Sequence, residues 1–196
     1  MTAKLERSNL ILRSWSLLHR VRDVLMKCED ERFGEYGLTS EQYGVLVTIE
    51  YLGESARPTD IARWSARSPN SISMIIDRMV KAGLVRRVRD RSDRRVVRVF
   101  ITGKGENALK PATTVGLEFV QKLMLPLSDE DLSTFVKLLE IVRHAAFNCL
   151  NQEVTMEEMR GNDITYQADL MERLTQYTLP STPKAKHQGG KKRKTI

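Results

Sequence analysis

Cysteine is scarce in this 196-residue sequence, and its two cysteines, Cys28 and Cys149, have no CxxC or CxH neighbour. This scarcity argues against a disulfide scaffold and against a zinc finger. No apolar run approaches the roughly 18 residues that a membrane span needs. The first ten residues carry charges of both signs and lack the apolar core of a signal peptide. We therefore expect a cytoplasmic protein made of one domain, or of one domain with an appendage.

Histidine and the common catalytic motifs are also sparse. The sequence has no GxSxG, P-loop, HExxH or GxGxxG motif, and its three histidines (His19, His144 and His187) lie far apart. An enzyme is therefore not expected, and the sequence predicts no cofactor and no metal site. His19 and His144 are interpreted as structural residues of helices. Both cysteines are interpreted as buried structural residues, with redox sensing through Cys28 or Cys149 as the alternative.

Positive charge is in excess, with a net charge of +7 that is unevenly placed along the chain. Residues 57–104 contain 13 Lys and Arg against 4 Asp and Glu, and residues 184–196 contain 6 basic residues and no acidic ones. Residues 1–56 and 105–183 are net acidic. This asymmetry points to a polyanionic partner, of which nucleic acid is the commonest. An ordinary solvated charged face is the alternative.

Apolar residues at three- and four-residue steps predict several helices, over residues 8–28, 39–52, 58–65, 68–82, 103–125 and 129–150. Capping residues stand at four of their starts: Thr39, Ser68, Thr102 and Ser128. The acidic stretch 29–35 is predicted to break the chain between the first two helices. After residue 150 the pattern weakens. It predicts one further helix over residues 164–177 and a disordered basic tail over residues 179–196.

The helices over 58–65 and 68–82 are separated by a three-residue turn, which predicts a helix-turn-helix. The second helix has an apolar stripe and a polar opposite face. Small polar side chains at its N-terminus can approach base edges and phosphates in a major groove, and Arg78 lies farther along the same face. The predicted DNA-binding residues of this helix are Ser68, Asn70, Ser71, Ser73, Met74 and Arg78. Taken alone, this face has an ordinary exposed helix surface as its alternative interpretation.

A β-hairpin follows, which we call the wing, with predicted strands over residues 84–89 and 95–101. It contains seven arginines within thirteen residues, opposed only by Asp90 and Asp93. Arginine at a hairpin tip suits a narrow minor groove, and a nearby aspartate can fix the arginine in an extended rotamer. The predicted DNA-binding residues of the wing are Arg89, Arg91, Asp93, Arg94 and Arg95.

The segment GLVRRVRDRSDRRVVRVFITGKG, residues 83–105, resembles the wing signature of MarR-type winged helix-turn-helix transcriptional regulators. Its matching positions are Gly83, Leu84, Val85, Arg87, Asp90, Asp93, Arg94, Arg95, Thr102 and Gly105. Upstream, residues 68–73 and 77–84 resemble the start and the end of that family's recognition helix. Arg91 stands where the family usually has proline. The resemblance covers residues 8–150 in layout and implies a mainly α fold with a small β-hairpin wing, flanked by long dimerisation helices.

The resemblance further implies a homodimer that binds a pseudo-palindromic operator in double-stranded DNA, most often as a repressor. Residues 1–36 and 103–150 would form a helical dimerisation platform and residues 37–102 the DNA-binding lobe, with residues 151–196 as an extension that the family layout lacks. In the family pattern Asp93 and Arg95 are the wing's fixing pair and its minor-groove arginine. Many such proteins release DNA when a small aromatic or phenolic effector binds. A winged-helix module for protein contacts, without specific DNA binding, is the alternative function.

Overall fold

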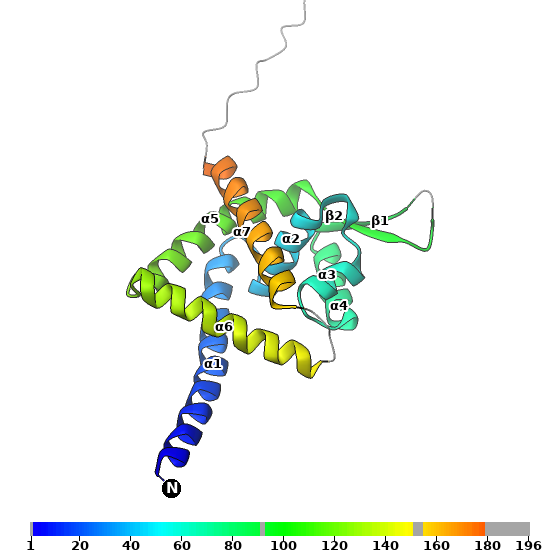
Figure 1. Ribbon diagram of the computed structural model, residues 1–196. Helices are drawn as coiled ribbons and strands as arrows, with labels where there is room; N and C mark the ends of the chain where they lie inside the picture. The colour runs from blue at the N-terminus through cyan, green and yellow to red at the C-terminus, as the bar shows by residue number, and fades with distance from the viewer. Residues whose placement is uncertain (1, 91–92, 151–154, 179–196) are drawn as a thin grey trace, which may run out of the picture.

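The computed structural model describes residues 2–90, 93–150 and 155–178, which form a mostly helical protein with one two-stranded hairpin (Figure 1). The predicted fold class, a winged helix-turn-helix flanked by long helices, is confirmed. The elements are α1 (Thr2–Gly34), α2 (Ser40–Leu52), the 3₁₀ helix η1 (Gly53–Ser55), α3 (Pro58–Trp64), α4 (Pro69–Lys81), β1 (Val85–Arg89), β2 (Val97–Ile101), α5 (Gly103–Met124), α6 (Asp129–Cys149) and α7 (Met156–Thr178). The predicted tail, residues 179–196, lies outside the described residues.

The hydrophobic core lies mainly between α2, α3, α4 and the wing, with α5 closing one side. Its largest fully buried side chains are Leu46, Ile61, Ile72, Ile76, Met79, Val99 and Leu109. α2 begins with the expected capping box, in which Thr39 Oγ1 accepts the Gln42 N–H and the Gln42 side chain accepts the Thr39 N–H. α4 begins at the expected cap, Ser68, with Pro69 in its first turn. The caps and the buried stripe of α4 together set which face of this helix points to solvent.

The wing is an antiparallel pair in which Val85 lies opposite Ile101 and Arg89 opposite Val97. Its second strand is shorter than predicted because the chain turns before it, where the Val96 N–H donates to the Asp93 carbonyl at 2.9 Å. The base of the wing packs tightly against the start of α5. A Cβ atom at Gly105 would lie 2.2 Å from the backbone oxygen of Leu84, so only glycine fits there.

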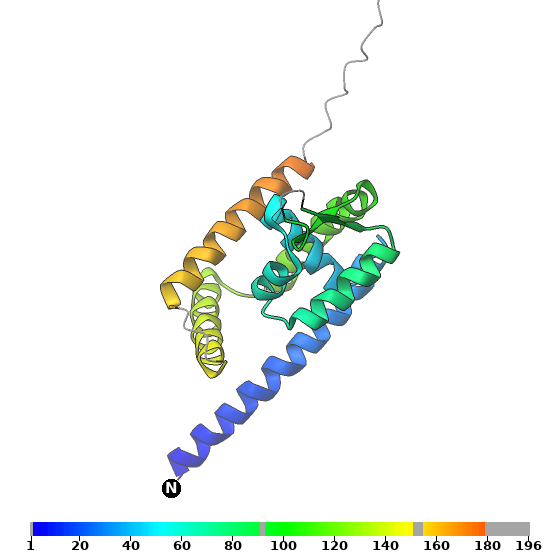
Figure 2. The same ribbon diagram turned by 90° about the vertical axis from the view of Figure 1, so that its right-hand side faces the viewer.

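α1 is longer than the predicted helix over residues 8–28, and the predicted break over residues 29–35 comes only at the end of that range, because the helix continues to Gly34. The acidic side chains of that stretch continue the helix, because glutamate is a good helix former. Phe33 is buried and stacks on Tyr43 of α2, with ring centroids 4.3 Å apart. The Asp30 carboxylate also accepts the Ser40 N–H at 2.7 Å. These contacts hold the last turns of α1 against α2, while its N-terminal half projects from the body (Figure 2).

α7 is also longer than the predicted helix over residues 164–177, since it begins at Met156. Thr155 Oγ1 accepts the Glu158 N–H, and the Glu158 carboxylate accepts the Thr155 N–H, which is a reciprocal cap. Met159 near this start is buried, and farther along Tyr166 packs against the main core. α7 therefore docks on the folded body over much of its length (Figure 1).

We call α1, α5 and α6 the platform helices. They present many large apolar side chains to solvent, including Leu10, Ile11 and Trp15 of α1. In α6, every residue of which the structure describes, no side chain is buried. The predicted cap Ser128 and the predicted apolar period of this helix are both present. Its apolar face therefore lacks a partner within the described part of the chain.

Candidate nucleic-acid interface

The outer face of α4 presents most of the predicted major-groove residues. Asn70, Ser71 and Arg78 are exposed, and Met74 is 64% exposed. At the helix start, Ser68 Oγ accepts the Ser71 N–H at 3.1 Å and lies 3.0 Å from Ser71 Oγ. The two hydroxyls are therefore held together beside the N-terminus of the helix. That end of the helix dipole favours an anion or an acceptor group.

Ser73 differs from the other predicted residues of α4 because it is half-buried at the edge of the exposed face. Arg78 folds back along the helix, and its Nε donates to the Met74 carbonyl at 3.4 Å. The structure thus brings Asn70, Ser71, Met74 and Arg78 together on one solvent-facing surface, with Ser73 at its border.

The tip of the wing presents the predicted minor-groove residues. Arg89, Asp93, Arg94 and Arg95 are exposed, and Arg91 lies outside the described residues. The Asp93 carboxylate accepts the backbone N–H of Arg95 at 2.9 Å. The described contact between these two residues therefore fixes the backbone of the turn, and through it the direction in which the Arg95 side chain leaves the wing.

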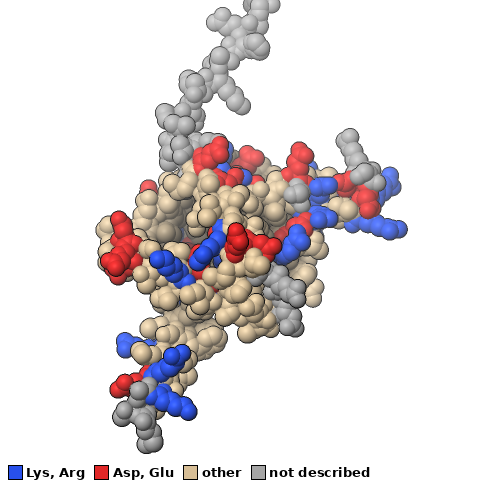
Figure 3. Space-filling model, in the orientation of Figure 1, with Lys and Arg blue, Asp and Glu red and all other residues tan. Residues whose placement is uncertain are grey.

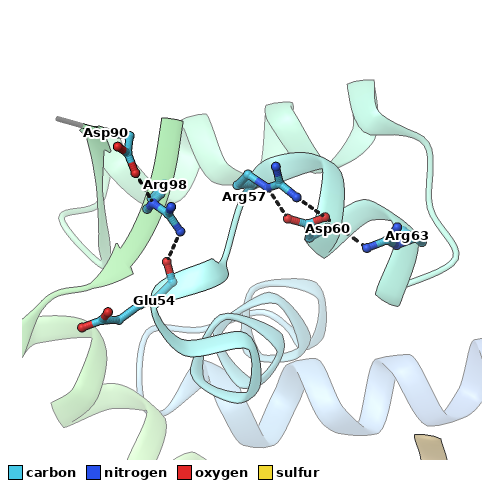
Figure 4. A network of polar contacts seen from close by, with 6 residues as sticks. All are labelled: Glu54, Arg57, Asp60, Arg63, Asp90 and Arg98. Atoms are coloured by element: carbon cyan, nitrogen blue, oxygen red, sulfur yellow. Dashed lines mark hydrogen bonds and ion pairs between the residues drawn. The ribbon is translucent and has the colours of Figure 1, made fainter. Parts of the chain in front are cut away.

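The wing is braced by contacts that the sequence patterns did not predict (Figure 4). Arg98 of β2 pairs with the Asp90 carboxylate at 2.8 Å and donates to the Glu54 carbonyl at 2.6 Å. The first contact crosses the hairpin, and the second joins it to η1. On the other strand, Arg87 pairs with Asp77 of α4 at 2.5 Å. These contacts fix the wing relative to the recognition helix.

A second basic group lies at the start of α3, the first helix of the helix-turn-helix (Figure 4). The Asp60 side chain accepts from Arg57 Nε at 2.5 Å and from Arg63 Nη2 at 3.2 Å. The hydrogen bond and the charge of Asp60 raise the pKa of Arg57 above its ordinary value. The i, i+3 spacing of these three residues is a sequence signal that could have identified the cluster. Arginines held in this way suit contacts to backbone phosphates.

The wing arginines therefore fall into two groups with different surroundings. Arg87 and Arg98 have carboxylate partners, and Arg86 lies over the Phe100 ring at 5.0 Å. Among the described contacts, none occupies the side chains of Arg94 and Arg95. Figure 3 shows basic side chains gathered at the end of the molecule from which the wing projects. The arginine charge that no carboxylate pairs with is thus concentrated at the tip of the wing.

The two cysteines do not share one environment. Cys28 of α1 is half-buried, whereas Cys149 at the end of α6 is exposed. The prediction that Cys149 is buried is wrong, because the apolar face of α6 has no cover in this chain. Among the described residues, no three or more His, Cys, Asp and Glu side chains are grouped so as to hold a metal ion. None of the described helices has the length and apolar character to cross a membrane.

Sequence comparison identifies regulators as relatives of this chain. The model of the MarR family matches residues 38–97. YsmB of Bacillus subtilis, an uncharacterized HTH-type transcriptional regulator, is 28% identical over 130 residues, covering 65% of this chain and 86% of that protein. The HTH-type transcriptional regulator PecS of Dickeya dadantii is 24% identical over 116 residues, covering 58% of this chain and 70% of that protein.

Solved structures agree with these relatives. A variant of Escherichia coli MarR in complex with operator DNA is 25% identical, with a TM-score of 0.62, over 68% of this chain and 96% of that chain. The organohalide-sensing regulator RdhR, bound to 2,4-dichlorophenol, is 21% identical with a TM-score of 0.69 and shares the fold over 74% of this chain and 85% of that chain. The region matched by the family model spans α2, α3, α4 and β1, the elements that build most of the interface described above. Residues 38–97 of this chain are therefore similar to the MarR family of transcriptional regulators, and the chain shares the winged helix-turn-helix fold of a solved MarR protein in complex with operator DNA.

Proposed function

We propose that this protein binds a pseudo-palindromic operator as a homodimer, with sequence specificity, and represses transcription there. The observation that supports this most is the exposed face of α4 beside the braced, arginine-tipped wing. In this proposal α4 enters a major groove, where Asn70, Ser71 and Arg78 meet base edges and phosphates. Arg94 and Arg95 reach the adjacent minor groove. Such a repressor would act in the cytoplasm, on the DNA that it regulates.

The homodimer is supported by the uncovered platform helices. Residues 1–36 and 103–150 would form the dimerisation platform, and residues 37–102 would form the DNA-binding lobe. A monomer rarely exposes as many large apolar side chains as α1, α5 and α6 present to solvent. Two-fold pairing would bury that surface and would place two copies of α4 one helical turn of DNA apart.

The test measures fluorescence anisotropy of the full chain on duplexes from its own promoter region. We expect Arg95→Ala to weaken binding by about 1–3 kcal/mol, since a minor-groove contact is lost while the fold is untouched. Arg20→Ala, which removes an exposed arginine from α1, is the matched control and should bind as the wild type does. Ser71→Ala should change the preferred sequence more than the overall affinity.

The alternative, a winged-helix module for protein contacts, has a different signature. A DNA-binding chain loses affinity steeply as salt rises, by about 0.9 in the slope of log K against log salt for each phosphate neutralised. Equal and salt-independent affinity for promoter and scrambled duplexes would contradict the proposed function. The same result would favour the alternative.

A further inference from the structure

α7 contacts both the DNA-binding lobe, residues 37–102, and the platform helix α6. The family resemblance extends only to residue 150, so it does not account for this helix. In Figure 1, α7 lies between α6 and α5 and runs alongside α2. Its first half pairs with α6 and its last turns pair with α2. One helix therefore joins the part of the fold that carries the recognition helix to the part that carries the uncovered apolar face.

The first half of α7 is held to α6 by two ion pairs. The two Asp163 carboxylate oxygens accept from Arg143 Nη1 and Nη2 at 3.0 and 2.6 Å. Arg160 Nη2 lies 2.7 Å from the Glu140 carboxylate. Both ion pairs described between α6 and another element are thus with α7. The apolar side of α6 takes no part in them and remains open to solvent.

The last turns of α7 are held to α2 at Glu50. Arg173 Nη1 lies 3.2 Å from Glu50 Oε2, and Arg173 Nη2 donates to the Glu50 backbone carbonyl at 3.1 Å. The Tyr177 hydroxyl donates to Glu50 Oε1 at 2.7 Å. One turn before Arg173, Asp169 accepts from its Nε at 2.8 Å and so orients the guanidinium. Arg173 and Glu50 are only 22% and 26% exposed, so solvent screens their attraction only in part.

Between these two sets of contacts, Tyr166 packs on the lobe. Its ring centroid lies 5.4 Å from that of Tyr51 in α2 and 5.9 Å from that of Trp64 in α3. The face that α7 turns to the body is therefore built largely from ion pairs and phenol rings. Hydrogen bonds depend on direction, and a satisfied polar network favours one relative placement of the elements that it joins. An interface of this kind is suited to fixing an orientation.

We propose that α7 fixes the orientation of the DNA-binding lobe relative to α6, and that Arg173 is the positioning residue at the lobe end. Its planar guanidinium contacts the Glu50 carboxylate, the Glu50 carbonyl and Asp169 at once, which the single ammonium group of a lysine does not reproduce. The lobe also packs against α1 and α5, through Phe33 and Leu109 of the core. Loss of the Arg173 contacts therefore leaves the lobe folded and attached, but free to turn relative to α6.

The consequence concerns the operator, and it rests on the proposed function. In the proposed homodimer α6 packs against a second copy, so the angle between α6 and the lobe sets the separation of the two copies of α4. One base pair inserted between the half-sites moves them apart by about 3.4 Å and rotates one against the other by about 35°. A dimer with fixed lobes cannot follow this change, whereas a dimer with mobile lobes can. α7 thus makes the chain selective for the spacing of the half-sites.

The fixed orientation is tested without DNA, by double electron–electron resonance on the full chain. One spin label is placed on Cys149 at the end of α6 and the other on Lys81→Cys at the end of α4, both exposed positions, with Cys28→Ser. Labelled chains are diluted with unlabelled ones, so that the distance within one chain dominates. We expect one narrow distance distribution. Arg173→Met should widen it about twofold or more, because directional contacts at the lobe end are lost.

Three further variants sharpen this measurement. Gln167→Met is the matched control, since it makes the same replacement at an exposed position of α7, and it should keep the distribution narrow. Arg173→Lys should give an intermediate width. Tyr177→Phe removes only the hydroxyl that donates to Glu50, so it tests the same anchor with a smaller change and should widen the distribution less. Distributions in Arg173→Met and Tyr177→Phe as narrow as in Gln167→Met would overturn the proposal, whatever the DNA experiments show.

Anisotropy then tests the spacing on the promoter operator and on the same duplex with one base pair inserted between its half-sites. The wild type should bind the inserted duplex at least about tenfold more weakly, because only one half-site can be engaged fully. Arg173→Met should lose at most about threefold, since its lobes can adjust. Comparing the two duplexes within each variant cancels the loss of one positive charge. Equal ratios in Arg173→Met and the wild type would overturn the spacing role.

Failure of the proposed function gives a different result. A wild type that binds neither duplex would overturn operator binding, and the spacing role with it. The distance distributions would still decide whether α7 fixes the lobe, because they are measured within one chain and without DNA.

Discussion

α6 and α7 are neighbouring helices of similar length that relate to the rest of the molecule in opposite ways. α6 has a clear apolar stripe and a capping box at Ser128, yet none of its residues is buried. α7 has a weaker apolar pattern and exposes Ile164 and Met171, yet it buries Met159 and packs against the core. The helix with the stronger sequence pattern is thus the one with less cover.

The difference shows that an apolar stripe predicts a buried face without saying which chain covers it. α7 docks through aromatic contacts of Tyr166 and through ion pairs with other helices. Asp163 pairs with Arg143 of α6, Arg160 with Glu140 of α6, and Arg173 with Glu50 of α2. α6 uses its charged side for this contact and leaves its apolar side free. In the proposed homodimer, the apolar side of α6 packs against a second copy of the chain.

The largest expected effect comes from a charge placed on that free face. Leu138 is 56% exposed in the middle of α6. Leu138→Glu should convert the dimer to a monomer at micromolar concentration, because a buried carboxylate without a partner is strongly unfavourable. DNA affinity should fall by about 100-fold or more, since the second half-site no longer adds to the first. Analytical ultracentrifugation and anisotropy measure the two effects.

Ser133→Glu is the control for this change. Ser133 is exposed on the same helix, and its replacement by glutamate adds the same charge. It lies outside the apolar stripe that contains Leu138. It should leave the dimer intact. A dimeric Leu138→Glu variant, or a wild-type chain that sediments as a monomer, would show that the free face of α6 has another use.

The winged helix-turn-helix was predictable because its signals are local. Thr39 and Ser68 cap their helices as expected, and the stripe of α4 is buried at Ile72, Ile75, Ile76 and Met79. Val80, at the end of that stripe, is 38% exposed. The start of α7 was missed although Thr155-x-x-Glu158 has the pattern of a capping box. Local capping chemistry was present there, but no strong apolar period followed it.

The contacts that brace the interface were not predictable, because they join residues far apart in the sequence. Arg98 reaches the Glu54 carbonyl across 44 positions, and Arg173 reaches Glu50 across 123. Both depend on tertiary packing that no period or spacing describes. The same limit applies to a cavity of about 760 Å³ whose lining residues come mostly from α2, α3, α6 and α7. The composition was enough to locate the basic wing. Only the fold shows that Arg87 and Arg98 have carboxylate partners, whereas the described contacts leave the side chains of Arg94 and Arg95 unpaired.

A smaller effect is expected from alkaline pH, and it should weaken the docking of α7 without acting on α6. Burial raises the pKa of Tyr166 from 10.0 to about 12. The folded chain therefore keeps this proton when the unfolded chain has lost it, so the stabilisation is complete below pH 10 and is lost as the pH rises from about 10 to about 12. We expect the docking of α7 to weaken in that window, by at most about 3 kcal/mol.

Ultraviolet difference absorbance measures the titration, and amide exchange of α7 measures the detachment. Tyr166→Phe should remove one late-titrating phenol and weaken the pH dependence of α7 protection between those values, while Tyr177, whose pKa is also raised by burial and by its hydrogen bond to Glu50, keeps the rest. The control is Tyr36→Phe in the turn between α1 and α2, which removes a half-buried tyrosine outside α7. Loss of protection in α6 at the same pH as in α7 would contradict the independence of the two helices.

The smallest effect concerns the ion pair that joins α6 to α7. Arg143 and Asp163 are each more than a third exposed, so solvent screens their attraction. A double-mutant cycle with Arg143→Ala and Asp163→Ala should give a coupling energy of about 0.2–1 kcal/mol in thermal unfolding. The same cycle on Arg22 and Asp23 of α1, whose side chains are 62% and 67% exposed, should give a value near zero. Equal couplings in the two cycles would mean that the Arg143–Asp163 pair does not hold α7 to α6, and this part of the contrast between the two helices would be wrong.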